Sequence, residues 1–149
     1  MQMDFSNKVE LPPTRPLLKL SSCEDFFDRD YNTLIVDVEN RVLQFAWDIA
    51  APNVLRREVR LWRGAALAWY HDRPTPKLTE EEVYRMILPN RDIRSTELER
   101  ILSCTHQHVY ELAPLLKVTR APQQADGPNS FTVFSRESIV AFLRSRRIS

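Results

Sequence analysis

Glycine and cysteine are both scarce in this chain, whose 149 residues include only 2 of each. A sequence so poor in glycine offers no glycine-rich loop of the kind that cradles nucleotide phosphates. Two cysteines without a clustered pattern predict reduced, structural thiols, because a disulfide framework needs several cysteines at defined spacings. The scarcities therefore exclude P-loop nucleotide enzymes and disulfide-stapled secreted domains.

Long apolar runs are also missing. No stretch approaches the roughly 18 apolar residues that a membrane-spanning helix needs. The opening MQMDFSNKVELPPTRP lacks the basic-then-apolar order of a secretory signal peptide. We therefore expect a cytoplasmic protein with no membrane partner. A hydrophobic content of 43% suffices for one ordinary core or two very small ones.

Groups with the spacing of a catalytic site are not apparent either. No paired carboxylates or nucleophile and base stand at a spacing that supports catalysis, so we expect no enzyme and no cofactor. Cys104 and His108 could share a helix face, with His106 between them, but no second group of ligands accompanies them, so we expect no metal. The three tryptophans are interpreted as core residues and not as a platform for stacking bases.

Charge is nearly balanced overall but uneven along the chain. The 21 basic and 20 acidic side chains leave a net charge of +1. Residues 51–77 hold 6 basic and 2 acidic side chains (+4), and residues 101–149 hold 6 and 3 (+3). Residues 1–50 hold 5 and 9 (−4), and residues 78–100 hold 4 and 6 (−2). Because electrostatic fields act locally, the blocks matter more than the total.

Hydrophobic periodicity predicts the elements of the first half. A proline-rich extended arm is expected over residues 1–18, followed by a short helix in SSCEDFF capped by Ser21 or Ser22. A second helix in DYNTLIVDVEN should end at Asn40 in the left-handed conformation. Over residues 43–49 the apolar period changes to two, which is typical of a half-buried strand. A turn and a returning strand in RREVRLW complete a hairpin, and GAALAWYH is helical.

The second half repeats this order after a connecting helix in TEEEVYRMIL, where Thr79 and Glu82 form a capping box. STELERIL has a second such pair, Thr96 with Glu99. Thr105 is a suitable cap for a helix in HQHVYELA. Two strands joined by a polar turn at residues 126–129 and a final helix in SRESIVAFLRSRR follow.

Each half is therefore predicted to run helix, turn, helix, hairpin, helix, as two copies of one small unit. Two short helices joined by a tight turn and followed by a β-hairpin, the wing, make a winged helix-turn-helix. The predicted fold class is α+β, mostly helical, with tandem winged helix-turn-helix units. We assign an arm (1–18), a degenerate first unit (19–73), a linker and connecting helix (74–92) and a second unit (93–149).

From Ile93 to Arg147 the sequence resembles the excisionase and mercury-resistance-regulator superfamily of small winged DNA-binding domains. The resemblance rests on STELERIL followed by SCTHQHVYELA, in which a buried residue precedes a polar cap and a Val-aromatic-x-Leu pattern ends the helix. SRESIVAFLRSRR is similar to the family's closing helix. The chain departs from the family where a small residue usually precedes the wing, since Ala113-Pro114 and Asn40-Arg41 stand there. Asp37 also replaces an expected apolar residue in the first copy.

The resemblance implies which side chains face duplex DNA. In this family the second helix of each unit is the recognition helix, here DYNTLIVDVEN in the first unit and HQHVYELA in the second. Contacts would come from the first turn of the first of these helices, from the cap and outward side of the second, and from the two wings. These residues are Thr105, His106, Gln107, His108 and Glu111 on the second helix, Asn32 and Thr33 on the first, and Arg56, Arg57, Arg60, Arg120 and Gln123 on the wings. Arginine suits phosphate contacts because its planar fork donates two hydrogen bonds to one group.

The function that follows is sequence-specific binding of double-stranded DNA. By resemblance the protein is expected to be an excisionase-like recombination accessory factor or a small transcriptional regulator of a bacterium or mobile element, with a recombinase or RNA polymerase as a further partner. Two alternatives stay open. The arginines can be solvated surface residues without a partner, because the net charge is small for a DNA-binding protein. The winged fold can also serve as a protein-interaction module that does not bind DNA.

Overall fold

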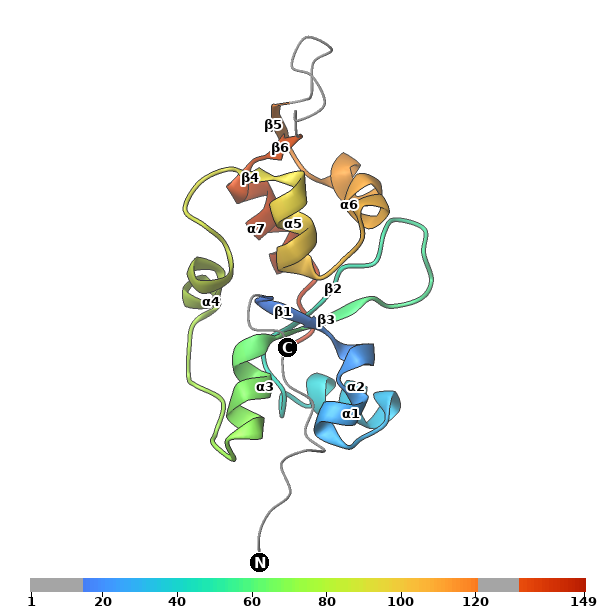
Figure 1. The fold of residues 1–149 in the computed structure, drawn as a ribbon, viewed down its shortest axis with the longest axis vertical. Helices are drawn as coiled ribbons and strands as arrows, with labels where there is room; N and C mark the ends of the chain where they lie inside the picture. Colours follow the sequence, from blue (N-terminus) through green and yellow to red (C-terminus); the bar gives the residue numbers. More distant parts are fainter. Residues whose placement is uncertain (1–14, 121–131) are drawn as a thin grey trace, which may run out of the picture.

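The computed structural model describes residues 15–120 and 132–149. Over these residues the protein is an α+β fold with seven α-helices and two three-stranded antiparallel sheets, which confirms the α+β part of the predicted class. Figure 1 shows the first sheet near the middle of the molecule and the second at its upper end. No helix in the described ranges is long and apolar enough to cross a membrane.

The first half forms the lower part of the molecule (Figure 1). Helix α2 begins where the Asp30 carboxylate accepts a hydrogen bond from the backbone N–H of Thr33 at 2.8 Å, an N-cap that satisfies one of the free N–H groups of the first turn. The elements are β1 (Leu17–Lys19), a 3-10 turn (Leu20–Ser22), α1 (Glu24–Phe27), α2 (Tyr31–Glu39), β2 (Ala46–Asp48), β3 (Val59–Trp62) and α3 (Arg63–Tyr70).

The second half begins with a connecting helix whose predicted capping box is confirmed, since Thr79 and Glu82 exchange both hydrogen bonds. Thr105 is the N-cap of α6, as expected, and its Oγ1 accepts from the His108 N–H at 3.1 Å. The elements are α4 (Glu80–Ile87), β4 (Ile93–Arg94), α5 (Ser95–Leu102), α6 (His106–Leu112), a 3-10 turn (Ala113–Leu115), β5 (Val118–Arg120), β6 (Val133–Phe134) and α7 (Arg136–Ser145).

Both halves follow the same course. Apart from the connecting helix α4, each starts with a short strand, continues through two helices and a hairpin, and ends in a helix. The strand orders are β1-β3-β2 and β4-β6-β5, so in each sheet the last strand of the half lies between the other two. The helix, turn, helix, hairpin, helix order predicted from the sequence is thus present twice, with one added strand at the start of each half.

A single hydrophobic cluster joins the halves. Trp47 on β2 is fully buried, and its indole Nε1 donates a hydrogen bond to the Tyr84 hydroxyl of α4 at 3.3 Å. The C-terminal residues pair with β2, where the Ile148 N–H donates to the Ala46 carbonyl at 2.8 Å and the Asp48 N–H donates to the Arg146 carbonyl at 2.9 Å. The interpretation of the tryptophans as core holds for Trp47 and Trp62, while Trp69 is 39% exposed.

Three local predictions about the ends of helices were wrong. Neither Ser21 nor Ser22 caps α1, because both lie in the preceding 3-10 turn. Helix α5 begins at Ser95, so Glu97 accepts from the Arg94 N–H and Thr96 with Glu99 forms no capping box. Arg41, and not Asn40, adopts the left-handed conformation after α2.

Two predictions about strands also change. The arm expected to run to residue 18 contains most of β1, which pairs with β3 from Leu17 opposite Trp62 to Lys19 opposite Arg60. The first strand of the hairpin is shorter than the alternating pattern of residues 43–49 indicates, because only Ala46–Asp48 pairs with β3. The predicted turn at residues 126–129 lies outside the described residues.

Candidate nucleic-acid interface

Helix α6 has a buried side and an exposed side. Val109 and Leu112 are 2% and 0% exposed, as the family pattern predicts, and they anchor the helix in the core. Cys104, expected to be buried, is only partly so. The remaining side presents Gln107 and its neighbours to solvent. The exposed residues of the α6 segment are Thr105, His106, Gln107, Tyr110 and Glu111.

These exposed side chains interact only weakly with the rest of the fold. His106 Nδ1 lies 3.5 Å from Glu99 Oε2, and Gln107 Nε2 donates to Glu111 Oε1 at 3.3 Å. Surface contacts of this kind contribute little to stability, so an incoming partner can replace them at small cost. Tyr110, which sequence reasoning did not select, is 71% exposed beside them. The sequence feature that could have identified Tyr110 is its place at the aromatic position of the Val-aromatic-x-Leu pattern, between the two buried residues.

His108 is not among the residues that face outward. It is half-buried, and its Nε2 lies 2.6 Å from the carbonyl oxygen of Ile49. Because a carbonyl can only accept, Nε2 carries the proton and donates. The expectation that His108 contacts bases is therefore corrected. Its side chain connects α6 to the segment that follows β2 in the first half.

The predicted residues of the first half divide into surface and interior. Asn32 and Thr33 are exposed on the first turn of α2, and Arg56 and Arg57 are exposed in the β2–β3 loop, residues 49–58. Arg57 NH1 donates to Glu39 Oε1 at 2.9 Å, which ties the β2–β3 loop to the end of α2.

The expectation that Arg60 lies on an exposed wing is also wrong. Its side chain is 2% exposed, and its Nε donates to the Leu102 carbonyl at the end of α5 at 2.7 Å. Its NH1 lies 3.3 Å from Glu58 Oε2 and from the Val59 carbonyl. Burial lowers the pKa of the guanidinium, with the Glu58 carboxylate opposing the shift. Arg60 therefore holds the two halves together and does not belong to an exposed wing.

Most of the remaining predicted residues belong to three elements, α2, the β2–β3 loop and α6. Figure 1 shows α2, the β2–β3 loop and α6 along the same side, with α4 on the other. The contacts between Glu39 and Arg57 and between Ile49 and His108 join these three elements in that order. Arg120 is exposed on β5, and Gln123 lies outside the described residues. We call α2, the β2–β3 loop and α6 the joined face.

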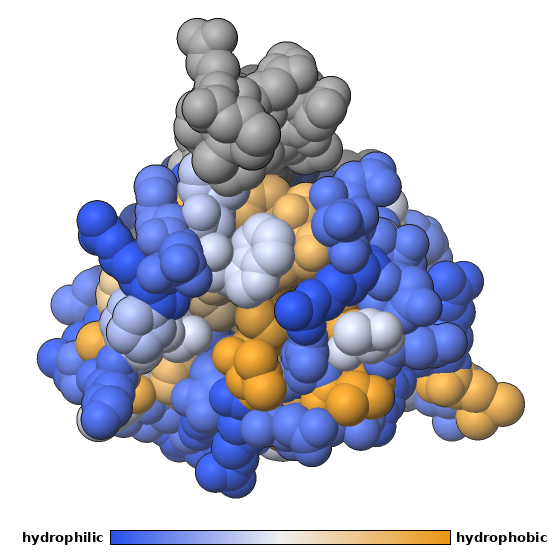
Figure 2. All heavy atoms as spheres, turned by 90° about the horizontal axis from the view of Figure 1, so that it is seen from below, coloured by the Kyte–Doolittle hydropathy of each residue, from blue (hydrophilic) through white to orange (hydrophobic). Residues whose placement is uncertain are grey.

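The joined face is mixed in character. Arg56 and Arg57 carry its positive charge, while negative charge comes from Asp37, Glu39, Glu58 and Glu111. Leu55 at the tip of the loop is fully exposed, and Val54 beside it is 48% exposed. A different exposed apolar region lies at the lower end of the molecule, where Figure 2 shows apolar atoms between hydrophilic ones.

Neither thiol shows the features of a reactive or metal-binding group. Burial raises the pKa of the Cys23 thiol to about 12 and that of the Cys104 thiol to about 11, so both are protonated at neutral pH. In the part of the chain that the structure describes, no three histidine, cysteine or acidic side chains are placed to hold a metal ion.

Comparison with protein-family models, with curated proteins and with solved structures gives no match.

Proposed function

We propose that the protein binds double-stranded DNA through tandem winged helix-turn-helix units whose reading elements form the joined face. The observation that supports this most is the continuity of α2, the β2–β3 loop and α6 along one side. In a winged helix-turn-helix, the second helix enters the major groove and the wing contacts the backbone. In this proposal the β2–β3 loop is the wing of the first unit and α6 is the second helix of the second unit, and the two are in contact through Ile49 and His108.

The proposal gives each exposed group a role. Gln107 and His106 on α6, and Asn32 on α2, would contact base edges, since amide and imidazole groups hydrogen-bond there. Arg56 and Arg57 on the loop would contact phosphates. Arg57 must then exchange its ion pair with Glu39 for a phosphate, which costs little because both side chains are about half exposed.

The cellular role is proposed from the family resemblance. An excisionase-like recombination accessory factor or a small transcriptional regulator would place such a reader beside a recombinase or RNA polymerase. Both roles need DNA binding by a protein that is itself not an enzyme. Because the two halves follow one another in one chain without a twofold axis, a direct repeat is the expected form of the DNA site.

A protein-interaction module is the second candidate, and a specific observation favours it. Leu55 and Val54 are exposed at the tip of the loop, and the formal charge of the chain is only +1. Exposed apolar side chains surrounded by polar ones are typical of protein-binding surfaces. Such a surface would lose little affinity as salt rises, whereas phosphate contacts lose much.

The test is the salt dependence of duplex binding measured by fluorescence anisotropy. We expect log K to fall linearly with log salt for the wild-type chain, with a slope that decreases by about one unit for each of Arg56→Ala and Arg57→Ala. Arg85→Ala is the matched control and should leave the slope unchanged, because Arg85 is exposed and belongs to α4, which lies on the other side of the molecule from α6. Equal slopes for all variants, or no binding, would favour the protein-interaction module.

A further inference from the structure

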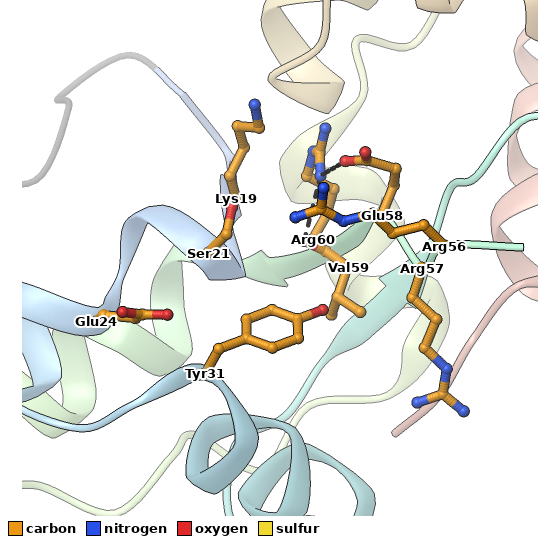
Figure 3. Close-up of a pocket in the computed structure, with 9 residues that line it drawn as sticks. All are labelled: Lys19, Ser21, Glu24, Tyr31, Arg56, Arg57, Glu58, Val59 and Arg60. Carbon is orange, nitrogen blue, oxygen red and sulfur yellow. Dashed lines mark hydrogen bonds and ion pairs between the residues drawn. The ribbon is translucent and has the colours of Figure 1, made fainter. Parts of the chain in front are cut away.

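A pocket of about 380 Å³ opens beside the β2–β3 loop. Its walls come from the end of β1, the start of α2, the loop and β3 (Figure 3). Pockets that bind small molecules commonly measure about 300–1,000 Å³, so the space suits a ligand larger than a simple ion. Sequence reasoning did not find this pocket, because its residues come from three separate segments.

The lining is polar and carries an excess of positive charge. Four basic and two acidic residues, the latter being Glu24 and Glu58, are among those that line it, for a formal charge of +2. The basic residues are Lys19, Arg56, Arg57 and Arg60. Ser21 and Tyr31 add hydroxyl groups that can donate to an anion.

The basic side chains of the pocket differ in whether they already have hydrogen-bond or ion-pair partners in the protein. Arg60 is held by the Leu102 carbonyl and by Glu58, and Arg57 is paired with Glu39. Lys19 and Arg56, in contrast, have no ion pair within the described residues. In Figure 3 the Arg56 guanidinium points back toward Arg60, while that of Arg57 points away. The pocket thus presents two unpaired cations beside a buried, fixed guanidinium.

We propose that this pocket binds the phosphate group of a small phosphomonoester, such as a nucleoside monophosphate. A phosphomonoester carries about −1.5 to −2 charges at pH 7 and three acceptor oxygens. Its charge is comparable to the two positive charges of Lys19 and Arg56, which both line the pocket. Lys19 and Arg56 neutralise it, and the remaining volume holds the organic part. This site shares Arg56 with the proposed contacts to DNA phosphates but does not include α6, and its binding of a small phosphomonoester does not depend on DNA binding.

Isothermal titration calorimetry of the full chain tests the site with four probes: adenosine 5′-monophosphate, adenosine, inorganic phosphate and dimethyl phosphate. We expect saturable binding of the monophosphate, weaker binding of inorganic phosphate, and none of adenosine, which lacks the anion. Dimethyl phosphate carries a single charge, as a nucleic-acid phosphodiester does, and should bind at least about tenfold more weakly than inorganic phosphate.

Variants identify the pocket as the site. Lys19→Ala should weaken monophosphate binding about tenfold, because a charge-assisted hydrogen bond is lost, and Lys19→Gln should do the same. Arg85→Ala, outside the pocket, should leave binding unchanged. Because Lys19 is exposed, thermal melts should show wild-type stability for both Lys19 variants.

Two results would overturn the proposal. One is the absence of saturable heat with either the monophosphate or inorganic phosphate. The other is a preference for dimethyl phosphate together with a loss of duplex affinity in Lys19→Ala, which would make the pocket a contact for the DNA backbone. If the wild-type chain binds the monophosphate but does not bind duplex DNA, the proposed function is refuted and this site is retained.

Discussion

The two sheets have the same strand order but different surroundings. All four residues of β3, the central strand of the first sheet, are buried, whereas all three residues of β5 in the second sheet are exposed. The end of α5 and the C-terminal residues pack against the first sheet. One arrangement of strands and helices thus provides the centre of the molecule in one half and an outer hairpin in the other.

One side chain on each central strand illustrates the difference. β3 carries Arg60, whose buried guanidinium satisfies the Leu102 carbonyl at the end of α5. β6 carries Val133, which is half-buried. A buried charge is stable only when its hydrogen bonds are made, so Arg60 requires the second half to be present. The first sheet is therefore completed by residues from outside its own half.

The largest expected effect is that of Arg60→Ala. Removing the guanidinium leaves a cavity, an unpaired Leu102 carbonyl and an uncompensated Glu58, so we expect the free energy of unfolding to fall by about 3 kcal/mol. Val133→Ala on β6 is the matched change and should cost about 1 kcal/mol. Urea denaturation measures both. Equal losses in the free energy of unfolding for the two variants would contradict the difference drawn between the two sheets.

Removal of residues 147–149 should have the next largest effect. The Ile148 and Ser149 backbone groups bond to Ala46, and the Ser149 hydroxyl donates to the Leu43 carbonyl. The loss of these bonds should lower the free energy of unfolding by about 2 kcal/mol. Arg147→Ala, which removes the contact with Glu80 but keeps the backbone bonds, is the control and should cost less. A truncated chain as stable as wild type would show that the tail does not complete the first sheet.

The smallest effects concern the two helix caps. Thr105→Ala should cost about 1 kcal/mol at all pH values, because a hydroxyl caps α6. Asp30 caps α2 with a carboxylate, and the Thr33 N–H holds its pKa below the usual range. Its contribution is present above the unfolded pKa of about 4 and is lost as pH falls through the lower folded value. In thermal melts between pH 7 and pH 2, the difference in stability between wild type and Asp30→Ala should therefore vanish at low pH. The difference between wild type and Thr105→Ala should persist.

Elements with a local signal could be predicted from the sequence. Thr79 and Thr105 stand three residues before the backbone N–H groups they satisfy, so spacing alone identifies them. Arg60 and His108 could not be placed, because their partners are 42 and 59 residues away in sequence. Alternation on β3 indicated an outward Arg60, but the sheet is covered on both faces. Long-range contacts thus decided which of the proposed DNA-contacting residues remained exposed.

The most direct test of the joined face is an NMR titration of the full chain with a duplex of about 20 base pairs. A shared face predicts that both halves respond together when such a duplex binds. We expect amide signals of α2, residues 49–58 and α6 to shift with one common saturation curve, while those of α4 stay unchanged. Shifts confined to α6 and β5, or no shifts at all, would contradict the claim that the two halves present one DNA-binding face.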